Sequence, residues 1–252
     1  MGSKGAVPNA RQRVREAIRA DIVASARDQL AVDGAGALSL RAVARDLGMA
    51  SSAMYRYFPS RDDLLTALII EAYDALGEAA ESAAARGGHT FSRWQAACRS
   101  VREWAVEHPH EYTLIYGSPV PGYLAPAETI GPASRVTLVL ARLLVDAQEA
   151  GELVPVDDPP LPRAMAAEAR QLAQLAMPGV PLPAVAKGLV AWTQLFGQVN
   201  FELFGQLHGI VGDPEAFFDF AISTMARLVG IHPVRKTTRD STRRLADDQG
   251  SG

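Results

Sequence analysis

Residues 39–58 constrain the fold of this 252-residue chain more than any other stretch. Apolar residues between positions 40 and 47 recur at spacings of three and four, which places them on one face of a short helix that Ser39 can cap. Gly48 follows, where a tight turn between two helices needs a positive φ. A second short helix is expected over about residues 51–57, with Met54 turned toward the first. The pattern predicts a helix-turn-helix.

The outward side of the second helix carries small, aromatic and basic side chains, a combination suited to a DNA major groove. Small residues at its start allow close approach, and Arg56 can bond guanine or grip a phosphate. Arg61 stands at the start of the following helix, where free backbone N–H groups already favour an anion. The expected DNA-binding residues are Ser39, Arg41, Ser51, Ser52, Ala53, Tyr55, Arg56, Tyr57 and Arg61. Taken alone, the pattern would also fit a helical hairpin with a solvated outer face.

Residues 39–65 resemble the N-terminal module of TetR-family regulators, and with the preceding helix the resemblance covers about residues 13–65. The matching positions are Ser39 at the helix start, Ala44 at the helix crossing, Gly48 in the turn, residues 54–58 (Met-Tyr-Arg-Tyr-Phe) and residues 61–64 (Arg-Asp-Asp-Leu). Ala50 stands where the family usually has serine, so another residue, such as Ser51, would have to cap the second helix. The resemblance implies that the remainder is a helical ligand-sensing and dimerising domain.

Helix-period patterns continue through the rest of the chain, separated by glycine and proline. The first helix is expected from residue 11, with Val14 and Ile18 on its apolar face, to a stop at Gly34. A long helix with Ser60 as its N-cap is expected over residues 61–86. Further helices are expected near residues 90–107, 110–116, 132–150, 162–177, 183–208 and 214–229. The stretch 117–132, with four prolines and three glycines, is expected to be irregular.

Charge is distributed unevenly along the chain, although the net charge is only −3. Residues 1–62 have a balance of +4, residues 63–230 of −9 and residues 231–252 of +2. A basic head on an acidic body is expected when only the head meets a polyanion. The single cysteine, Cys98, excludes an internal disulfide and suits a reducing cytoplasm, and its apolar setting indicates packing rather than redox sensing. No apolar run approaches the roughly 18–20 residues that span a bilayer, so we expect a cytoplasmic protein without membrane contact.

These features predict an all-α fold with an N-terminal three-helix helix-turn-helix module followed by a larger helical ligand-binding and dimerisation domain. The expected division is a DNA-binding domain at residues 1–62, ordered from about residue 11, and a regulatory and dimerisation domain at residues 63–232. Residues 233–252 are rich in Arg, Thr and Asp without periodicity, and a disordered tail is expected there.

The larger domain carries aromatic residues that could line a ligand cavity. Its segment 108–119 and the Trp192 and Phe196-Gly197 positions resemble the WHG group of the TetR family, with Phe196 where that label has histidine. The expected ligand-binding residues are Trp104, His108, Tyr112, Tyr116, Met165, Met177, Trp192, Phe196 and Asn200. Aromatic residues at helical spacing are more often plain core, and that alternative stays open for each of them.

The last two expected helices carry more large apolar residues than a single buried stripe needs, which indicates two buried faces each. A two-fold four-helix interface would use the second face. The expected dimer-interface residues are Val199, Leu203, Phe217, Phe218, Ala221 and Met225. The alternative is that both helices are central core helices of one chain.

The resemblance implies a ligand-responsive regulator, foremost a repressor, that binds a palindromic operator in double-stranded DNA as a homodimer and is released by a small apolar or amphipathic effector. The same head could instead serve an activator. A helical enzyme or carrier is a further alternative from another class. It has little support, because the sequence shows no nucleophile–base pair, phosphate-binding glycine loop or metal cluster. No catalytic residue, cofactor or metal site is expected.

Overall fold

The structure, a computed structural model, describes residues 10–155 and 159–234, and over this range it consists of helices joined by turns and loops. The helices are α1 (Ala10–Asp33), α2 (Leu40–Asp46), α3 (Ser51–Met54), α4 (Arg61–Ala84), α5 (Thr90–Glu107), α6 (Pro109–Tyr116), α7 (Ile130–Glu149), α8 (Arg163–Ala176), α9 (Leu182–Leu203) and α10 (Pro214–Leu228), with short 3-10 turns η1 (Ala35–Ala37) and η2 (Ala127–Thr129). Within the described residues the only β-type pairing is an isolated bridge between Leu153 and Ile231. The expected all-α fold is confirmed.

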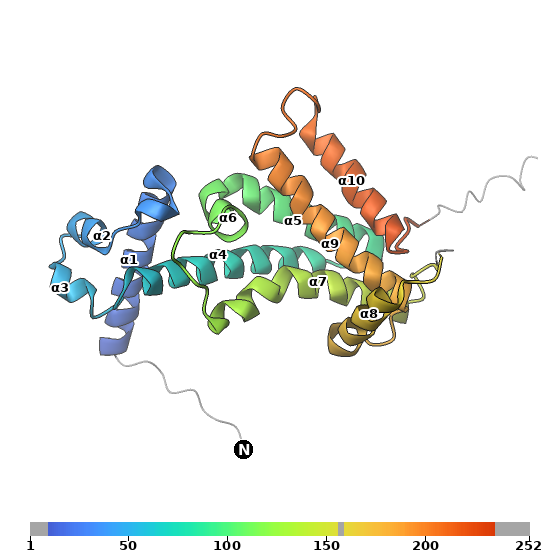
Figure 1. The fold of residues 1–252 in the computed structure, drawn as a ribbon, viewed down its shortest axis with the longest axis horizontal. Coiled ribbons are helices and arrows are strands. Elements are labelled where there is room, and N and C mark those ends of the chain that lie inside the picture. The colour runs from blue at the N-terminus through green and yellow to red at the C-terminus, as the bar shows by residue number, and fades with distance from the viewer. Residues whose placement is uncertain (1–9, 156–158, 235–252) are drawn as a thin grey trace, which may run out of the picture.

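The molecule is elongated, with α1, α2 and α3 forming a head at one end (Figure 1). Helix α4 begins in this head and runs into the body, where it packs between α5 and α7. Helices α9 and α10 pack on each other and on α5, and α8 packs mainly on α9. One long helix therefore connects the two ends of the protein.

Two clusters of buried apolar residues divide along α4. The head cluster joins the inner faces of α1, α2 and α3 to the first turns of α4, as far as Ile69. The body cluster begins at Ala72 and takes in α5 to α10. In the body, Trp94 on α5 is buried and its indole N–H donates to the carbonyl of Ile222 on α10 at 3.1 Å. The expected domain boundary at residue 62 stays a prediction, and the head cluster reaches past it.

Bidentate ion pairs tie the long helices of the body together. Arg135 on α7 bonds both carboxylate oxygens of Glu81 on α4, at 2.8 and 2.6 Å. Arg102 on α5 bonds both oxygens of Glu202 on α9, also at 2.8 and 2.6 Å. Such forked pairs orient the two groups more strictly than a single contact does. They fix how α5 and α4 sit against their neighbours.

Most helix ends agree with the expected ones, because glycine or proline marks them. Two expectations need correction. Val14 is 59% exposed, since α1 meets the head cluster only from Ile18 onward. Helix α9 ends at Leu203 and not near residue 208, and turns follow from Phe204. The expected tail falls largely outside the described residues, which end at 234.

Candidate DNA-binding head and ligand cavity

The helix-turn-helix forms as the sequence predicts at its first helix and turn. The Ser39 hydroxyl accepts a hydrogen bond from the backbone N–H of Ala42 at 3.4 Å and so caps α2. Gly48 has a φ of 64°, a left-handed conformation that costs other residues strain. The N–H of Met49 then bonds back to the carbonyl of Ala44, which is fully buried where α2 and α3 meet. The turn therefore depends on a small residue and on a glycine.

The second helix is shorter than expected and lacks a side-chain cap. Helix α3 ends at Met54, and residues 55–57 form turns. Its N-cap is Ala50, which makes no side-chain hydrogen bond, and Ser51 is the first helical residue, so Ser51 does not substitute as a cap. Met54 and Phe58 are buried and anchor the segment to the head cluster.

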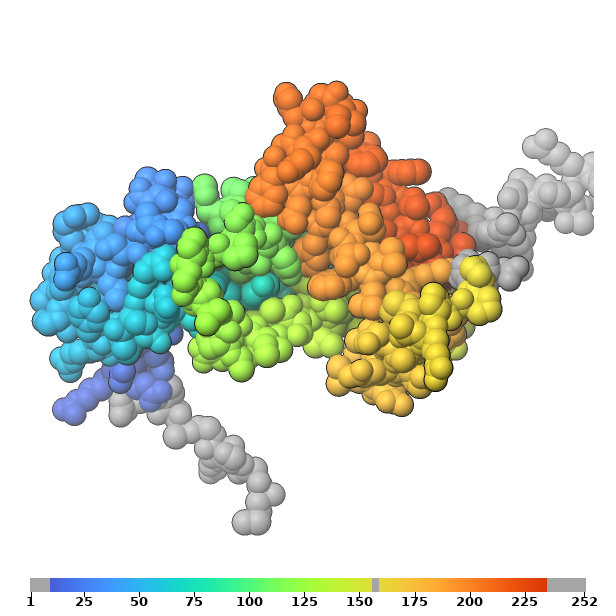
Figure 2. Space-filling model, in the orientation of Figure 1, coloured from blue at the N-terminus to red at the C-terminus, as the bar shows by residue number. Residues whose placement is uncertain are grey.

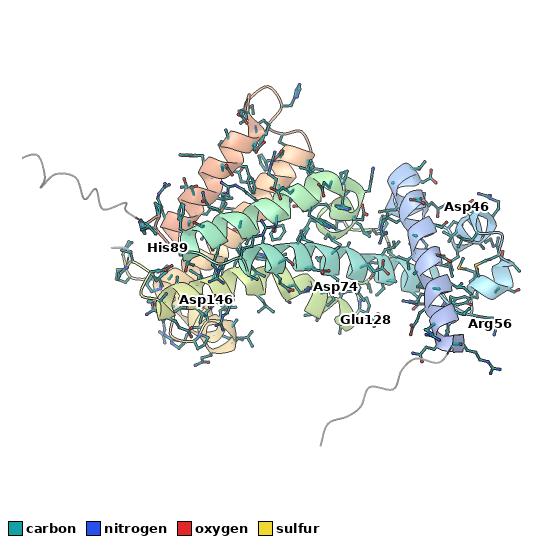
Figure 3. The ribbon with its side chains drawn as sticks, turned by 180° about the vertical axis from the view of Figure 1, so that it is seen from behind. Asp46, Arg56, Asp74, His89, Glu128 and Asp146 are labelled. Carbon is teal, nitrogen blue, oxygen red and sulfur yellow. The ribbon has the colours of Figure 1, made fainter. Side chains whose placement is uncertain are left out.

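Five of the nine expected DNA-contacting residues are exposed on the head, and the other four, Ser39, Ala53, Tyr57 and Arg61, are half-buried. Arg41, Ser51, Ser52, Tyr55 and Arg56 are exposed, and Figure 3 shows Arg56 at the head end of the molecule. Tyr57 packs against the head cluster. The exposed set gives the head a polar, basic surface at the helix-turn-helix.

Arg61 turns toward the connection between α1 and α2, which gives it a second role beside the phosphate contact that the sequence predicts at the start of α4. Its Nη2 donates to the carbonyls of Ala35 at 2.7 Å and Gly36 at 3.2 Å, and its Nε donates to Leu38 at 3.1 Å. The guanidinium thereby fastens α4 to the turn between α1 and α2. With these donors engaged by carbonyl oxygens, the side chain is occupied in positioning the head.

The first turns of α1 form a basic extension that the sequence interpretation did not assign to DNA. Arg11, Arg13 and Arg15 are exposed on the two turns that precede contact with the head cluster. Arg19, one turn further on, lies over the ring of Phe58 at 4.3 Å. The signal is the density of arginines in residues 11–19, which enters the sequence-based prediction only through the charge balance of residues 1–62.

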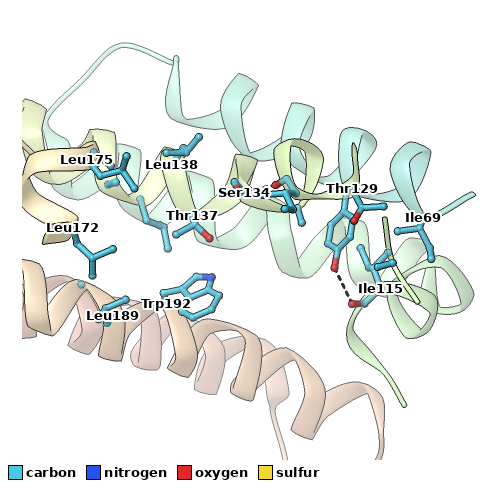
Figure 4. A pocket seen from close by; sticks show the side chains of 18 of the residues that line it. Ile69, Ile115, Thr129, Ser134, Thr137, Leu138, Leu172, Leu175, Leu189 and Trp192 are labelled. Carbon is cyan, nitrogen blue, oxygen red and sulfur yellow. Dashed lines mark hydrogen bonds between the residues drawn. The ribbon is translucent and has the colours of Figure 1, made fainter. Parts of the chain in front are cut away.

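The body contains a cavity of about 760 Å³, a size typical of small-molecule sites. Its wall comes from α4, α6, the α6–α7 connection, α7, α8 and α9, with Trp94 of α5 added to it. In Figure 2, atoms of α4 are visible at the bottom of a hollow between the α6–α7 connection, α7 and α9. The wall is predominantly apolar, and its labelled side chains in Figure 4 include Leu172, Leu189 and Trp192 on one side and Thr137 and Leu138 on the other.

Only two of the expected ligand-binding residues, Met177 and Trp192, lie in the wall of this cavity. The other expected residues lie elsewhere, and most of them pack on one another: Trp104, His108, Tyr112, Tyr116, Met165, Phe196 and Asn200.

The aromatic residues outside the cavity wall form a packed cluster behind it. The rings of Tyr116 and Phe196 stack with centroids 4.2 Å apart, and Trp104 stacks on His108 at 5.0 Å. The Tyr112 hydroxyl donates to the Asn200 side-chain oxygen at 2.9 Å. Burial raises the pKa of both tyrosines. The Tyr112–Asn200 hydrogen bond and the Tyr116–Phe196 stack hold α6 against α9, as the plain-core alternative predicts.

The cavity residues that the sequence interpretation missed come from α4, α7 and the irregular connection between α6 and α7. Ile69, Tyr73, Tyr123, Ser134 and Thr137 are examples. The sequence predicts this connection only as irregular, and no periodic signal reveals that it folds over a cavity.

Three of the expected dimer residues are buried within the single chain, which corrects that assignment. Val199, Phe218 and Met225 are at most 5% exposed and belong to the body cluster. Leu203 and Ala221 pack against the same cluster, and Phe217 is half-buried. The exposed apolar residues on α9 and α10 are Val190, Phe201, Phe220 and Leu228. Periodicity indicates two apolar stripes on these helices but does not show which of them faces the core.

Two further observations concern the described part of the chain. None of its helices is both long and apolar enough to cross a membrane. Residues 10–155 and 159–234 contain no group of three or more His, Cys, Asp or Glu side chains that could hold a metal ion.

A helix-turn-helix head carried on a helical body is the architecture of a DNA-binding transcriptional regulator. A family model for bacterial regulatory proteins of the tetR family matches residues 22–68, and one for the tetracyclin repressor-like C-terminal domain matches residues 94–225. The chain therefore belongs to the TetR family of transcriptional regulators. The resemblance to that family is confirmed, while the WHG grouping stays a prediction.

Known relatives agree over nearly the whole length. The HTH-type transcriptional regulators Rv1816 of Mycobacterium tuberculosis and Mb1846 of Mycobacterium bovis are each 38% identical over 229 residues, covering 88% of this chain and 96% of theirs. The crystal structure of SCO4313, described as a regulatory protein, matches with a TM-score of 0.73 at 33% identity, over 87% of this chain and 98% of that one. A Rhodococcus sp. RHA1 protein of unknown function shares the fold with a TM-score of 0.62 at 24% identity, over 84% of this chain and 93% of that one.

Proposed function

We propose that this protein is a ligand-responsive repressor that binds a palindromic operator as a homodimer and is released when a small effector enters the body cavity. The observation that carries the proposal is that the cavity and the head share residues. Ile69 belongs to the head cluster, and Leu114, Ile115, Val120 and Tyr123 pack against it, while all five also line the cavity. A molecule in the cavity therefore touches the side chains on which the head rests.

Hydrogen bonds also connect α4 to α6 and to the α6–α7 connection at this junction between head and cavity. The Tyr123 hydroxyl lies 2.9 Å from the Thr66 hydroxyl on α4, and the Tyr73 hydroxyl donates to the carbonyl of Ile115 at 3.2 Å. Tyr73 and Tyr123 are part of the cavity wall. An effector that displaces either hydroxyl would change how α4 meets the α6–α7 connection. Only a ligand with different affinity for the two head positions can shift their populations.

For DNA contact we propose the exposed surface of α2 and α3 together with the start of α1. Arg56 is the foremost base-reading candidate, because it is exposed beyond the small residues of α3. Arg41 and the exposed arginines of α1 would grip phosphates. Ser39 is assigned to capping α2, and Arg61 to positioning the head.

For the homodimer we propose the exposed apolar side chains of α9 and α10. Phe220 is 66% exposed and Phe201 is 54% exposed, which is unusual for two phenylalanines on packed helices. Gly197 lies on α9, one turn before Phe201. A side-chain carbon added at Gly197 would meet nothing within 4 Å, so a helix of another chain could approach closely there. The substitution Phe220→Glu should give monomers in sedimentation, whereas Val32→Glu, at a position 83% exposed on the head, should not. Dimers that persist in the Phe220→Glu protein would contradict this interface.

The function is tested by selecting binding sites from a random pool of duplexes with the full chain and then measuring gel retardation. We expect an inverted repeat, retarded by the protein at concentrations that leave a scrambled duplex free. Transcripts of genes beside such sites should rise when the gene is deleted. A fall would indicate an activator, and no selected sequence would favour a helical protein without DNA binding. We infer that the chain has no catalytic activity, in line with relatives described as transcriptional regulators.

A further inference from the structure

None of the described residues that line the cavity carries a charged side chain. The polar side chains of this wall are hydroxyls and the indoles of Trp94 and Trp192, of which Trp94 already donates to the Ile222 carbonyl, and none of its described residues is Asp, Glu, Lys, Arg or His. An ion placed in such a wall would lose its hydration without gaining a partner. The wall therefore selects against carboxylates, phosphates and amines.

The hydroxyl donors of this wall are largely engaged already. Tyr73 donates to the carbonyl of Ile115, Thr129 donates to that of Pro126 at 2.8 Å, and Ser134 donates to that of Ile130 at 2.7 Å. These three hydroxyls donate to backbone carbonyls, so they offer a ligand mainly their acceptor lone pairs. A ligand that needs a buried, unpaired donor has to find it elsewhere in the wall.

Trp192 supplies that donor. Its Nε1 is buried and has no hydrogen-bond partner, and it is the one buried side-chain nitrogen or oxygen in this state within residues 10–155 and 159–234. An indole N–H can only donate. Buried donors are ordinarily paired, so an unpaired one in a cavity indicates an acceptor that arrives with the ligand. Figure 4 shows Trp192 on α9 across the cavity from Thr137 on α7.

The rim of the cavity is apolar as well. Ile130 and Leu138 on α7 and Leu175 on α8 line the cavity and are 64%, 52% and 81% exposed. Large apolar side chains left in water at the edge of an apolar hollow gain from covering by a hydrophobic ligand. The rim and the wall thus favour the same kind of molecule.

We propose that the cavity binds an uncharged lipophilic carbonyl compound, such as a ketone, ester or lactone, whose carbonyl oxygen accepts a hydrogen bond from the Trp192 indole N–H. This inference rests on the proposed function, in which the same cavity receives the effector, and it adds the chemical class of that effector. The carbonyl oxygen meets the one buried donor that has no partner among the described residues, and the hydrocarbon part covers the wall and the rim.

The test is direct binding of matched probes to the full chain, by titration calorimetry at pH 8. The probes are 2-undecanone, undecanoate, undecylammonium and pentylbenzene, the last of which has no acceptor oxygen. We expect 2-undecanone to bind at least about tenfold more tightly than either ion. Equal or tighter binding of an ion, or no binding of the ketone, would overturn the proposal.

Two variants test the anchor itself. Trp192→Phe keeps an aromatic ring and removes the N–H, and it should weaken 2-undecanone binding by about 2- to 12-fold, as one hydrogen bond does, while leaving pentylbenzene binding unchanged. Trp104→Phe makes the same change outside the cavity, and it should alter the binding of neither 2-undecanone nor pentylbenzene. Equal weakening of both probes by Trp192→Phe would refute the hydrogen bond. If the ketone binds with this pattern but never releases operator DNA, the ligand class stands and the proposed effector response fails.

Discussion

Replacing Arg61 with alanine separates a positioning role from a DNA-contacting role, because the two predict opposite changes. The side chain is only 31% exposed, and its guanidinium donates to the carbonyls of Ala35, Gly36 and Leu38. A hydrogen bond from a charged donor contributes about 1.5–3 kcal/mol to stability. Water can reach part of this site, so we expect Arg61→Ala to lower the free energy of unfolding by about 2–3 kcal/mol for all three bonds together.

That loss corresponds to a fall in Tm of about 4–12 °C for a domain of this size. It is measured by urea and thermal unfolding, alongside DNA binding at several salt concentrations. The slope of log affinity against log salt should stay unchanged in the Arg61→Ala protein, because no phosphate contact is removed.

Arg41→Ala is the matched control. Arg41 is exposed, and its side chain makes no hydrogen bond or ion pair with the described residues. Its loss should leave stability within about 0.5 kcal/mol and reduce the magnitude of the salt slope by about 0.9 for each phosphate contact. If Arg61→Ala instead reduced the slope and left stability unchanged, the positioning role would be refuted and the phosphate role restored.

Three further changes test the head, the core and the body. Gly48→Ala should cost about 1–2 kcal/mol in urea unfolding, because alanine at a φ of 64° is strained; an unchanged midpoint would mean that the turn adopts another conformation. Burial raises the pKa of the Cys98 thiol, so the folded protein keeps a proton that the unfolded chain loses, and stability should decline as pH rises above about 8.5. Substituting Cys98→Ala should reduce that decline, and an identical pH profile would show that other groups cause it. Arg102→Ala should lower the free energy of unfolding by about 2–3 kcal/mol, since it leaves Glu202 16% exposed and unpaired, and a double variant with Glu202→Gln should recover part of the loss.

Helix positions were predictable from this sequence because glycine, proline and capping residues mark the ends locally. Ser60 illustrates the point: its hydroxyl accepts from the N–H of Asp63 at 3.1 Å, as the spacing predicts. It was harder to predict which side of each helix packs against the core. Helix α10 carries two phenylalanines close together, of which Phe218 is 2% exposed and Phe220 is 66% exposed. Nothing in the local sequence pattern shows which side of the helix packs against α5.

The cavity was the least predictable feature, for a related reason. Periodicity identifies apolar residues that need burial, and a core aromatic satisfies that need as well as a ligand-lining one does. Phe196 packs on Tyr116, whereas Trp192, one turn earlier on the same helix, opens onto the cavity. That difference depends on where the α6–α7 connection crosses, and this connection has no repeating pattern to follow.

The placement of the cavity explains how a small ligand could act on a distant head without a long relay. Helix α4 belongs to both hydrophobic clusters, with Ile69 in the head cluster and Ala72 in the body cluster, less than one turn apart. Tyr73, one position further on, lines the cavity and bonds the carbonyl of Ile115 on α6. In the head, the Arg27 guanidinium of α1 forms ion pairs with Glu111 of α6 at 3.3 Å and with Glu71 of α4 at 3.0 Å. A ligand that moved α6 against α4 would therefore alter contacts with α1 in the head, so the coupling that we propose would need only direct packing at this junction.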